Sequence, residues 1–366
     1  MNSSSVQGNV ARNKTLGVET ASRRLQACAA AALLSCSAAG AWAHDSDEPA
    51  VVVTASNATT NQLLVYSLGG ALLDTVPTQG QGGVGGNAGG IAAAEGMVAV
   101  VNFGSNNVSV MSRGHGRSGF RVDSVVPSHG GPVSVAFGED HLYILTGTGV
   151  ESHAMGPHGV SANADGVVQL LHADGSAAQV GVIRGELVIT EKSNAVETVK
   201  LNAHGAVVGA AAMVAGIPAN IDTPLGLVTR GNEAYVTLAH ADEISLVRND
   251  KVLTTTPSVT QHAPCWLALD GPFLFSTNSP SKSISRYAVY GQQIVQDAAV
   301  VAQFNGSPTD IAYKSGVAAV IDSNGTASHV SVFKVDQDGN LTLRGLATLS
   351  NPKINGVAIV GAGDGH

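Results

Sequence analysis

Glu191 and Lys192 are adjacent residues of opposite charge that follow the strand-forming residues Ile189 and Thr190. A carboxyl group beside an ammonium group can serve as an acid–base couple, or the two can form a structural ion pair across neighbouring loops. Their adjacency favours the ion pair. Both residues still stand where an apolar run gives way to a loop, so both are candidates for a functional site.

Further candidate binding residues occupy comparable places, close to a proline or just after an apolar run. They are Asp222, His262, Trp266, Asn278, Asp310 and Asp322. If the apolar runs are strands of a repeat, the loops that carry these residues approach one face, where a ligand or partner is expected to bind. The alternative is that they are solvated loop residues with no ligand, and that Trp266 fills a channel instead of stacking on a ligand.

Histidines gather in one part of the chain. They are His115, His129, His141, His153, His158 and His172. No His-Glu-x-x-His, Cys-x-x-Cys or His-x-His pattern accompanies them, so the sequence predicts no metal site and no cofactor, and we expect these histidines to be mostly exposed. Cys265 lies in an apolar run, and we interpret it as a small buried hydrophobic residue and not as a nucleophile.

The spacing of prolines identifies the elements that must position these residues. Intervals of 92, 40, 44 and 44 residues separate Pro132, Pro224, Pro264, Pro308 and Pro352. A short apolar strand follows each of the first four, then a charged or glycine-containing turn, a second strand and a third. A repeat of about 44 residues built from short strands is typical of a β-propeller blade.

Counting repeat starts near residues 88, 132, 178, 224, 264 and 308 predicts six complete blades and a seventh that is split. The C-terminal residues 355–360 read as its inner strand, and the N-terminal residues 50–54 and 63–67 supply the others. The predicted fold is therefore all-β, a seven-bladed β-propeller whose ring is closed by pairing the C-terminal strand with N-terminal strands. A pair of all-β sandwiches is the alternative, but it would not show the 44-residue register. Residues 79–90, rich in glycine, read as a flexible connector between the first two blades.

The strand pattern resembles the Tyr-Val-Thr-Asn repeat of the lactonase-type seven-bladed propellers, which include 6-phosphogluconolactonase-like and carboxymuconate-cyclase-like proteins. Residues 234–237 read Ala-Tyr-Val-Thr, residues 275–278 read Phe-Ser-Thr-Asn and residues 100–102 read Val-Val-Asn. The resemblance covers residues 50–360. It implies the propeller fold, and it implies that Glu191 stands in the blade where the family places a glutamate after the strand.

One departure from that family bears on activity. Several inner strands of lactonase-type members begin Pro-Arg-His, residues implicated in binding or opening a lactone. Here the pairs that follow the prolines are Val133-Ser134, Leu225-Gly226, Cys265-Trp266, Thr309-Asp310 and Lys353-Ile354. The leading expectation is therefore a non-catalytic binding or interaction protein that uses the channel-rim loops. The alternative is a hydrolase or isomerase acting on a lactone or cyclic carboxylic acid, with Glu191 as acid or base.

Composition and charge limit the class of partner. The 366 residues are 44% hydrophobic and only 13% charged, which suits a large core and excludes a disordered chain. Without residues 1–43, which carry a net charge of +3, the formal charge falls from −8 to −11. A chain with so negative a net charge is not expected to bind nucleic acid or anionic lipid. We expect a monomer with a small molecule or a protein bound at the channel rim.

Residues 1–43 have the form of a secretory signal. Arg23 and Arg24 precede an apolar stretch at 27–39 that is too short to span a bilayer, and Ala41-Trp42-Ala43 offers a cleavage site. Twin-arginine export and a lipid anchor at Cys36 are less favoured readings of the same segment. We expect a single propeller domain over residues 44–366 and a periplasmic or secreted location, where phosphorylated sugar lactones, being cytoplasmic, are not the substrate.

Overall fold

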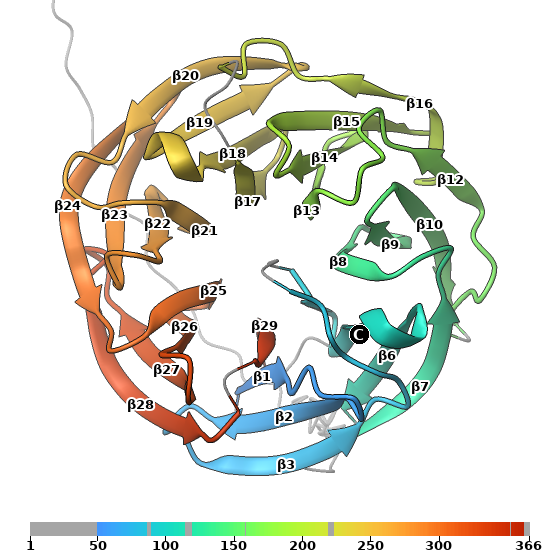
Figure 1. Cartoon of the computed structure of the whole chain (residues 1–366), viewed down its shortest axis with the longest axis horizontal. Coiled ribbons are helices and arrows are strands. Elements are labelled where there is room, and N and C mark those ends of the chain that lie inside the picture. Colours follow the sequence, from blue (N-terminus) through green and yellow to red (C-terminus); the bar gives the residue numbers. More distant parts are fainter. Residues whose placement is uncertain are drawn as a thin grey trace, which may run out of the picture. The chain divides into compact units, whose positions relative to one another are not determined.

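The described residues of the computed structural model form a ring of seven β-sheets, confirming the predicted seven-bladed propeller (Figure 1). The structure describes residues 50–85, 89–113, 119–157, 159–218, 223–351 and 353–361. The predicted signal segment, residues 1–43, lies outside them. No helix in the described part of the chain is long and apolar enough to cross a membrane.

The blades are numbered here by the order in which their strands are completed along the chain. Blade 1 contains β29 (Asn355–Val360), β1 (Val51–Ala55), β2 (Gln62–Ser67) and β3 (Leu72–Pro77). Blade 2 contains β4 (Ile91–Ala94), β5 (Met97–Asn102), β6 (Asn107–Arg113) and β7 (Phe120–Pro127). Blade 3 contains β8 (Pro132–Phe137), β9 (His141–Thr146), β10 (Gly149–Gly156), β11 (Gly159–Val160) and β12 (Gly166–Gln169).

The remaining blades each have four strands in sequence order. Blade 4 contains β13 (Ala177–Ile183), β14 (Glu186–Glu191), β15 (Ala195–Leu201) and β16 (Val207–Met213), and blade 5 contains β17 (Pro224–Arg230), β18 (Glu233–Leu238), β19 (Glu243–Arg248) and β20 (Lys251–Pro257). Blade 6 contains β21 (Pro264–Asp270), β22 (Phe273–Asn278), β23 (Ser283–Tyr290) and β24 (Gln293–Gln303), and blade 7 contains β25 (Ser307–Lys314), β26 (Val317–Ser323), β27 (Ser328–Val335) and β28 (Leu341–Leu349). Two single-turn 3-10 helices, η1 (Phe103–Ser105) and η2 (Ala239–Ala241), follow β5 and β18.

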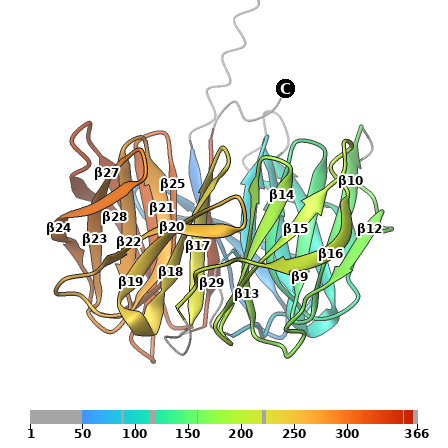
Figure 2. The same cartoon turned by 90° about the horizontal axis from the view of Figure 1, so that it is seen from above.

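Blade 1 closes the ring as the sequence predicts. The inner strand β29 pairs antiparallel with β1, so that Val360 lies opposite Val51 and Ala358 opposite Val53. Figures 1 and 2 show the red C-terminal strand beside the blue N-terminal strands, within one blade. This pairing of the two chain ends gives blade 1 its inner strand, so that blade 1 is complete and closes the ring.

The prolines mark the inner strands. Pro132, Pro224 and Pro264 are the first residues of β8, β17 and β21, and Pro308 is the second residue of β25. A β-bulge follows each of these four prolines in its strand. Proline at a strand start sacrifices no ladder hydrogen bond, which explains why it recurs there.

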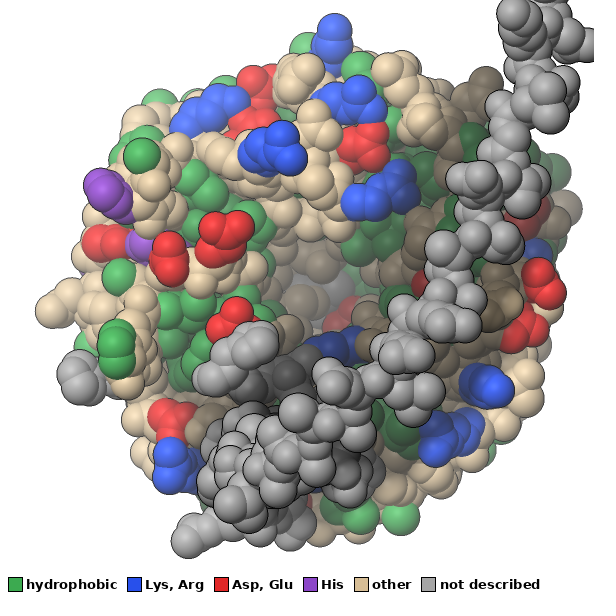
Figure 3. Space-filling view, turned by 180° about the vertical axis from the view of Figure 1, so that it is seen from behind, with side chains coloured by type: hydrophobic (Ala, Val, Ile, Leu, Met, Phe, Trp, Pro, Cys, Tyr) green, Lys and Arg blue, Asp and Glu red, His purple; other side chains and the backbone are tan. Residues whose placement is uncertain are grey.

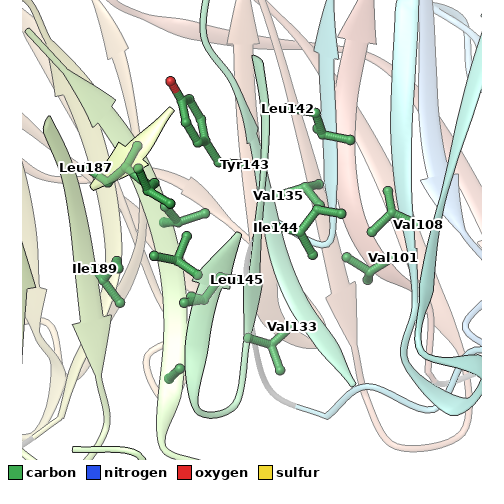
Figure 4. Packing of buried hydrophobic residues seen from close by; sticks show 14 of the residues in the cluster. Val101, Val108, Val133, Val135, Leu142, Tyr143, Ile144, Leu145, Leu187 and Ile189 are labelled. Carbon is green, nitrogen blue, oxygen red and sulfur yellow. The ribbon is translucent and has the colours of Figure 1, made fainter. Parts of the chain in front are cut away.

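Hydrophobic side chains between neighbouring sheets hold the ring together. Val135, Leu227, Leu267 and Ile311 are all buried, as expected for the third residue after each proline. Figure 4 shows one such layer, in which Val101 and Val108 of blade 2 face Val133, Val135 and Ile144 of blade 3, with Leu187 and Ile189 of blade 4 beyond. Figure 3 shows the face turned away from the viewer of Figure 1, where charged side chains of both signs surround a central hollow.

The glycine-rich segment after blade 1 is held in place, at least over residues 79–85, which corrects the expectation of a flexible connector. The Asn57 amide donates to the carbonyl of Val84 at 2.7 Å, and its oxygen accepts from the amide of Gly83 at 2.6 Å. Val84 itself packs into the core between blades 2 and 3. Side-chain hydrogen bonds and one buried apolar residue thus hold residues 79–85 in place, although their glycine-rich composition predicts a flexible segment.

Candidate functional site

In blades 2 and 6 the last residue of the second strand and the third residue of the third strand are hydrogen-bonded to each other, at the face where the loops between blades arrive. In blade 6 these residues are Asn278 and Ser285, and the Asn278 amide donates to the Ser285 hydroxyl at 2.8 Å. In blade 2 they are Asn102 and Ser109, joined in the same way at 2.8 Å. An amide facing a hydroxyl is therefore the pattern from which other blades depart.

Blade 4 replaces both members of this pair with acids, Glu191 at the end of β14 and Glu197 in β15. Glu197 is fully buried and accepts the backbone amides of Leu171 at 2.9 Å and His172 at 3.0 Å. It thereby holds the loop that enters blade 4 from blade 3. Glutamate reaches further than serine, which allows it to bond to the loop backbone directly.

Glu191 has no such partners. It is fully buried, and neither of its carboxyl oxygens has a hydrogen-bond partner. The nearest base is His172, whose Nδ1 lies 3.6 Å from Oε2. Burial, followed by the charges of Glu197 and Asp174, raises the pKa of Glu191 to about 8, so this carboxyl group is mostly neutral at pH 7.

The ion pair that the sequence suggests between Glu191 and Lys192 does not form among the described residues. Lys192 is only half-buried, its backbone amide bonds to the carbonyl of Ser176, and burial lowers the pKa of its ammonium group. Adjacent residues on a strand point to opposite faces of the sheet, so the two side chains diverge. Glu191 is therefore a buried and mostly neutral carboxyl group and not half of an ion pair.

Blade 3 carries the second acidic replacement, Glu151 in β10, at the position of Ser285 and Glu197. Its Oε1 accepts the backbone amide of His129 at 2.7 Å, and its Oε2 lies 2.9 Å from Nδ1 of the same histidine. Glu151 is 2% exposed, whereas the His129 side chain is 72% exposed. Burial raises the pKa of Glu151, but His153 and His129 outweigh it and hold that pKa below its usual value.

A second histidine contacts the same carboxylate from inside the blade. His153 is buried, its Nδ1 lies 3.0 Å from the carbonyl oxygen of Ser161, and its Nε2 lies 3.4 Å from Oε2 of Glu151. A carbonyl only accepts, so Nδ1 carries a proton. Nε2 has no hydrogen-bond partner. His141 is buried as well, so the expectation of mostly exposed histidines is wrong for His141 and His153, while His115 and His158 lie outside the described residues.

These side chains line a groove at the boundary of blades 2 and 3. One part, of about 420 Å³, is lined by His129 and His153 together with Pro127, Ala162, Ala164 and Val167. An adjoining part of about 190 Å³ shares His129 and Val167 and adds Glu151. We call this the His129 groove, defined by His129, Glu151, His153 and Val167. Its lining mixes apolar side chains with polar ones, which also include Ser128 and Asn163.

Most of the binding residues predicted from sequence are internal. Trp266 is 4% exposed and packs among inner-strand residues of blades 5 to 7. Asn278 is fully buried in the amide–hydroxyl pattern, and Asp322 is 2% exposed and lies 2.8 Å from Nδ1 of His329. Their role in binding stays a prediction, with side chains that already have partners inside the protein. Asp222 lies outside the described residues.

Asp310 links blade 7 to the closing strand. Its Oδ2 accepts the backbone amide of Val357 in β29 at 3.1 Å, and its Oδ1 accepts that of Ile311 at 2.8 Å. Burial raises the pKa of Asp310 to about 7 despite these bonds. His262 is different, because its side chain is 71% exposed and its Nδ1 lies 2.9 Å from Oδ2 of Asp242. Of the predicted binding residues, His262 is thus well placed to meet a partner.

Sequence reasoning missed Glu151, His153 and Glu197. The signal was present in the repeat, because the third strands read Val108-Ser109, Ile244-Ser245, Ile284-Ser285 and Val330-Ser331, whereas blades 3 and 4 read Val150-Glu151 and Val196-Glu197. Two adjacent blades therefore place an acid at a strand position that serine occupies in four other blades. A buried position that changes from a hydroxyl to a carboxyl group calls for new partners.

Comparison with solved structures places this ring among known propellers. A protein of Bacteroides fragilis, provisionally assigned as a 6-phosphogluconolactonase, superposes with a TM-score of 0.61 at 13% identity, over 86% of this chain and 99% of that one. A similarly assigned protein of Bacteroides uniformis gives 0.62 at 16% identity, over 86% and 100%. The fold is that of the lactonase-like propellers. At such identities the likeness concerns the fold alone.

Other structural neighbours carry different names. A protein of unknown function from Desulfotomaculum acetoxidans gives a TM-score of 0.62 at 12% identity, over 85% of this chain and 99% of that one. Virginiamycin B lyase from Staphylococcus aureus gives 0.52 at 14% identity, over 71% and 84%. No protein-family model matches the sequence, and no curated protein does either. The chain shares the seven-bladed propeller fold with these proteins.

Proposed function

We propose that this chain is an exported binding protein that takes a small molecule in the His129 groove at the rim of blades 2 and 3. The observation that carries the proposal is the meeting of two buried groups at the groove wall. Nε2 of His153 lacks a hydrogen-bond partner and lies at the part of about 420 Å³, and the carboxylate of Glu151 lies at the adjoining part of about 190 Å³. A buried polar atom without a partner costs free energy, and a ligand that satisfies it recovers that cost.

The rim location agrees with the expectation of a binding site made by the loops that precede the inner strands. His129 belongs to the loop between β7 and β8, whereas Glu151 and His153 belong to β10. The groove therefore rests on two rigid sheets, with one exposed loop residue free to adapt. Export is a part of the proposal that rests on the signal-like residues 1–43.

A hydrolase or isomerase acting on a lactone is the second candidate, favoured by the provisional names of two structural neighbours. The obstacle lies in Glu191, whose carboxyl oxygens have no hydrogen-bond partner and whose closest base, His172, is 3.6 Å away. A general acid or base must reach its substrate, and Glu191 is fully buried. The binding role therefore fits the geometry better.

A thermal-shift screen of the protein against lactones and sugars tests the binding role. We expect at least one class to raise the melting temperature of the wild type, and the shift to disappear in Val167→Trp, which fills the groove from an exposed position on β12. The control is Val259→Trp, at an exposed valine remote from the groove lining. Shifts that survive Val167→Trp would place the ligand elsewhere and refute the proposal.

A further inference from the structure

We infer that the His129 groove contains a binding site for a divalent metal ion of the zinc class, with Glu151 and His153 as fixed ligands and His129 as the third. The inference rests on the proposed binding role of the groove and names the chemistry that the groove recognises. Two imidazole nitrogens and one carboxylate oxygen are a common donor set for zinc, and a fourth position would stay open to the groove.

The protonation state of His153 provides the first argument. Its Nδ1 donates to the carbonyl oxygen of Ser161 at 3.0 Å, so in the neutral ring the lone pair sits on Nε2. That lone pair faces Oε2 of Glu151 at 3.4 Å and has no hydrogen-bond partner. Nε2 and Oε2 thus lie at a separation that a metal ion between them could bridge with two coordination bonds.

The surroundings of the donors provide the second argument. Metal-bound histidines usually donate their other ring nitrogen to a carbonyl or carboxylate, and metal-bound carboxylates are themselves hydrogen-bonded. His153 meets the first condition through Ser161, and Glu151 meets the second because its Oε1 accepts the backbone amide of His129 at 2.7 Å. The separation of 3.4 Å between Nε2 and Oε2 is about that of two ligands on a tetrahedral zinc ion.

His129 must move for the site to form. Among the described residues, no three His, Cys, Asp or Glu side chains already surround a common metal position, and Nδ1 of His129 is hydrogen-bonded to Oε2 at 2.9 Å. The His129 side chain is 72% exposed, so its ring has room to turn about the side-chain bonds and present a lone pair to the ion once its hydrogen bond to Glu151 is broken. The metal then replaces a hydrogen bond with a coordination bond.

Isothermal titration calorimetry of the chelator-treated full chain with Zn²⁺ tests the inference. We expect one equivalent to bind to the wild type near pH 7.5, and binding to weaken at pH 5.5 because protons compete for the imidazoles. Mg²⁺ and Ca²⁺, which prefer oxygen ligands, should release no comparable heat. Absence of Zn²⁺ binding, or equal binding of all three ions, would overturn the inference.

Substitutions locate the ion. His129→Ala and His153→Gln should each weaken Zn²⁺ binding by about tenfold or more. His262→Gln is the matched control, because His262 is an exposed histidine of the loop between β20 and β21 and is hydrogen-bonded to a carboxylate, that of Asp242. If the buried His153→Gln variant unfolds, the exposed His129→Ala variant still decides. Equal weakening by His262→Gln and His129→Ala would mean adventitious binding to surface histidines.

The failure of this inference is distinguishable from failure of the proposed function. Val167→Trp changes the groove wall but none of the three ligands, so it should abolish the thermal shift by an organic ligand and leave Zn²⁺ binding intact. Zn²⁺ bound by Val167→Trp with wild-type affinity supports the metal site by itself, and loss of Zn²⁺ binding in that variant contradicts it.

Discussion

Glu191 and Asn278 occupy equivalent positions at the ends of β14 and β22, yet they meet opposite surroundings. The amide of Asn278 donates to two serine hydroxyls, at 3.1 Å and 2.8 Å. Glu191 faces a second buried acid, Glu197, whose oxygens are already occupied by backbone amides. The exchange of a donor for an acid explains why burial and like charge together raise the pKa of Glu191.

This raised pKa predicts a pH-dependent stability that Glu191→Gln should reduce. The folded protein holds a proton on Glu191 up to about pH 8, whereas the ordinary value is 4.5, so the free energy of unfolding falls as pH rises through that window. The slope from one such group is about 1.4 kcal/mol per pH unit. In denaturant titrations at pH 5 to 9, the free energy of unfolding of Glu191→Gln should rise relative to that of the wild type as the pH increases.

The pKa of Asp310 is also raised, to about 7. The Glu191→Gln variant should therefore keep the part of the pH dependence of stability that comes from Asp310. At pH 5 the wild type and the Glu191→Gln variant should be nearly equal in stability, because both then carry a neutral side chain at position 191. Parallel stability curves for variant and wild type would show that Glu191 is ionised in the fold. Loss of cooperative unfolding at pH 5 would show instead that the carboxyl group is structurally required.

At the scale of the elements, inner strands are linked by polar contacts as well as by apolar packing. Ser134 Oγ accepts the amide of Val180 in blade 4 at 3.3 Å, and Gln179 Oε1 accepts that of Leu227 in blade 5 at 2.7 Å. Asp310 does the same for Val357 in blade 1. Residues near the channel that suggest a binding rim by sequence thus serve to join one blade to the next.

Gly226 occupies the corresponding place in β17 and allows a close approach of β17 and β21. A Cβ at this position would collide with the carbonyl oxygen of Cys265, a backbone atom of β21 that cannot swing aside. We expect Gly226→Ala to lower the free energy of unfolding by about 1–3 kcal/mol through overpacking. Gly156→Ala is the matched control, since a Cβ there meets nothing within 4 Å. Equal melting temperatures for the two variants would refute a tight contact between β17 and β21.

The strands and the site differed in how far sequence could predict them. Alternation of apolar residues and the recurrent prolines predicted the blades, because burial between sheets acts on every repeat alike. The polar position shared by the third strands was harder to interpret. Ser109 and Ser285 look like ordinary strand residues until their hydrogen-bond partners are known. The role of Glu151 depends on its contacts with His129 and His153. These contacts are made by the fold and could not be predicted from the sequence.

At the scale of the whole molecule, a ring makes every blade a neighbour of two others, so that stability is shared around it. Blade 1 alone depends on both ends of the chain, through the pairing of β29 with β1. β29 also presents Ile359 and Val357 to the core shared with blade 7, and Ala358 and Val360 to the core shared with blade 2. Its loss would expose apolar surface on two flanking sheets as well as leave β1 unpaired.

A chain ending at residue 350 should therefore be far less stable than the full protein. It lacks β29, a strand whose six residues are all buried, and burial of each aliphatic side chain contributes about 1.5–3 kcal/mol. The free energy lost is comparable to the total stability of a typical domain, so we expect no cooperative thermal transition by circular dichroism. A chain ending at residue 361 keeps β29 and is the control. An unchanged melting temperature in the shorter chain would contradict a ring closed by β29, and addition of a peptide spanning residues 351–361 should restore the transition if the missing strand is the cause.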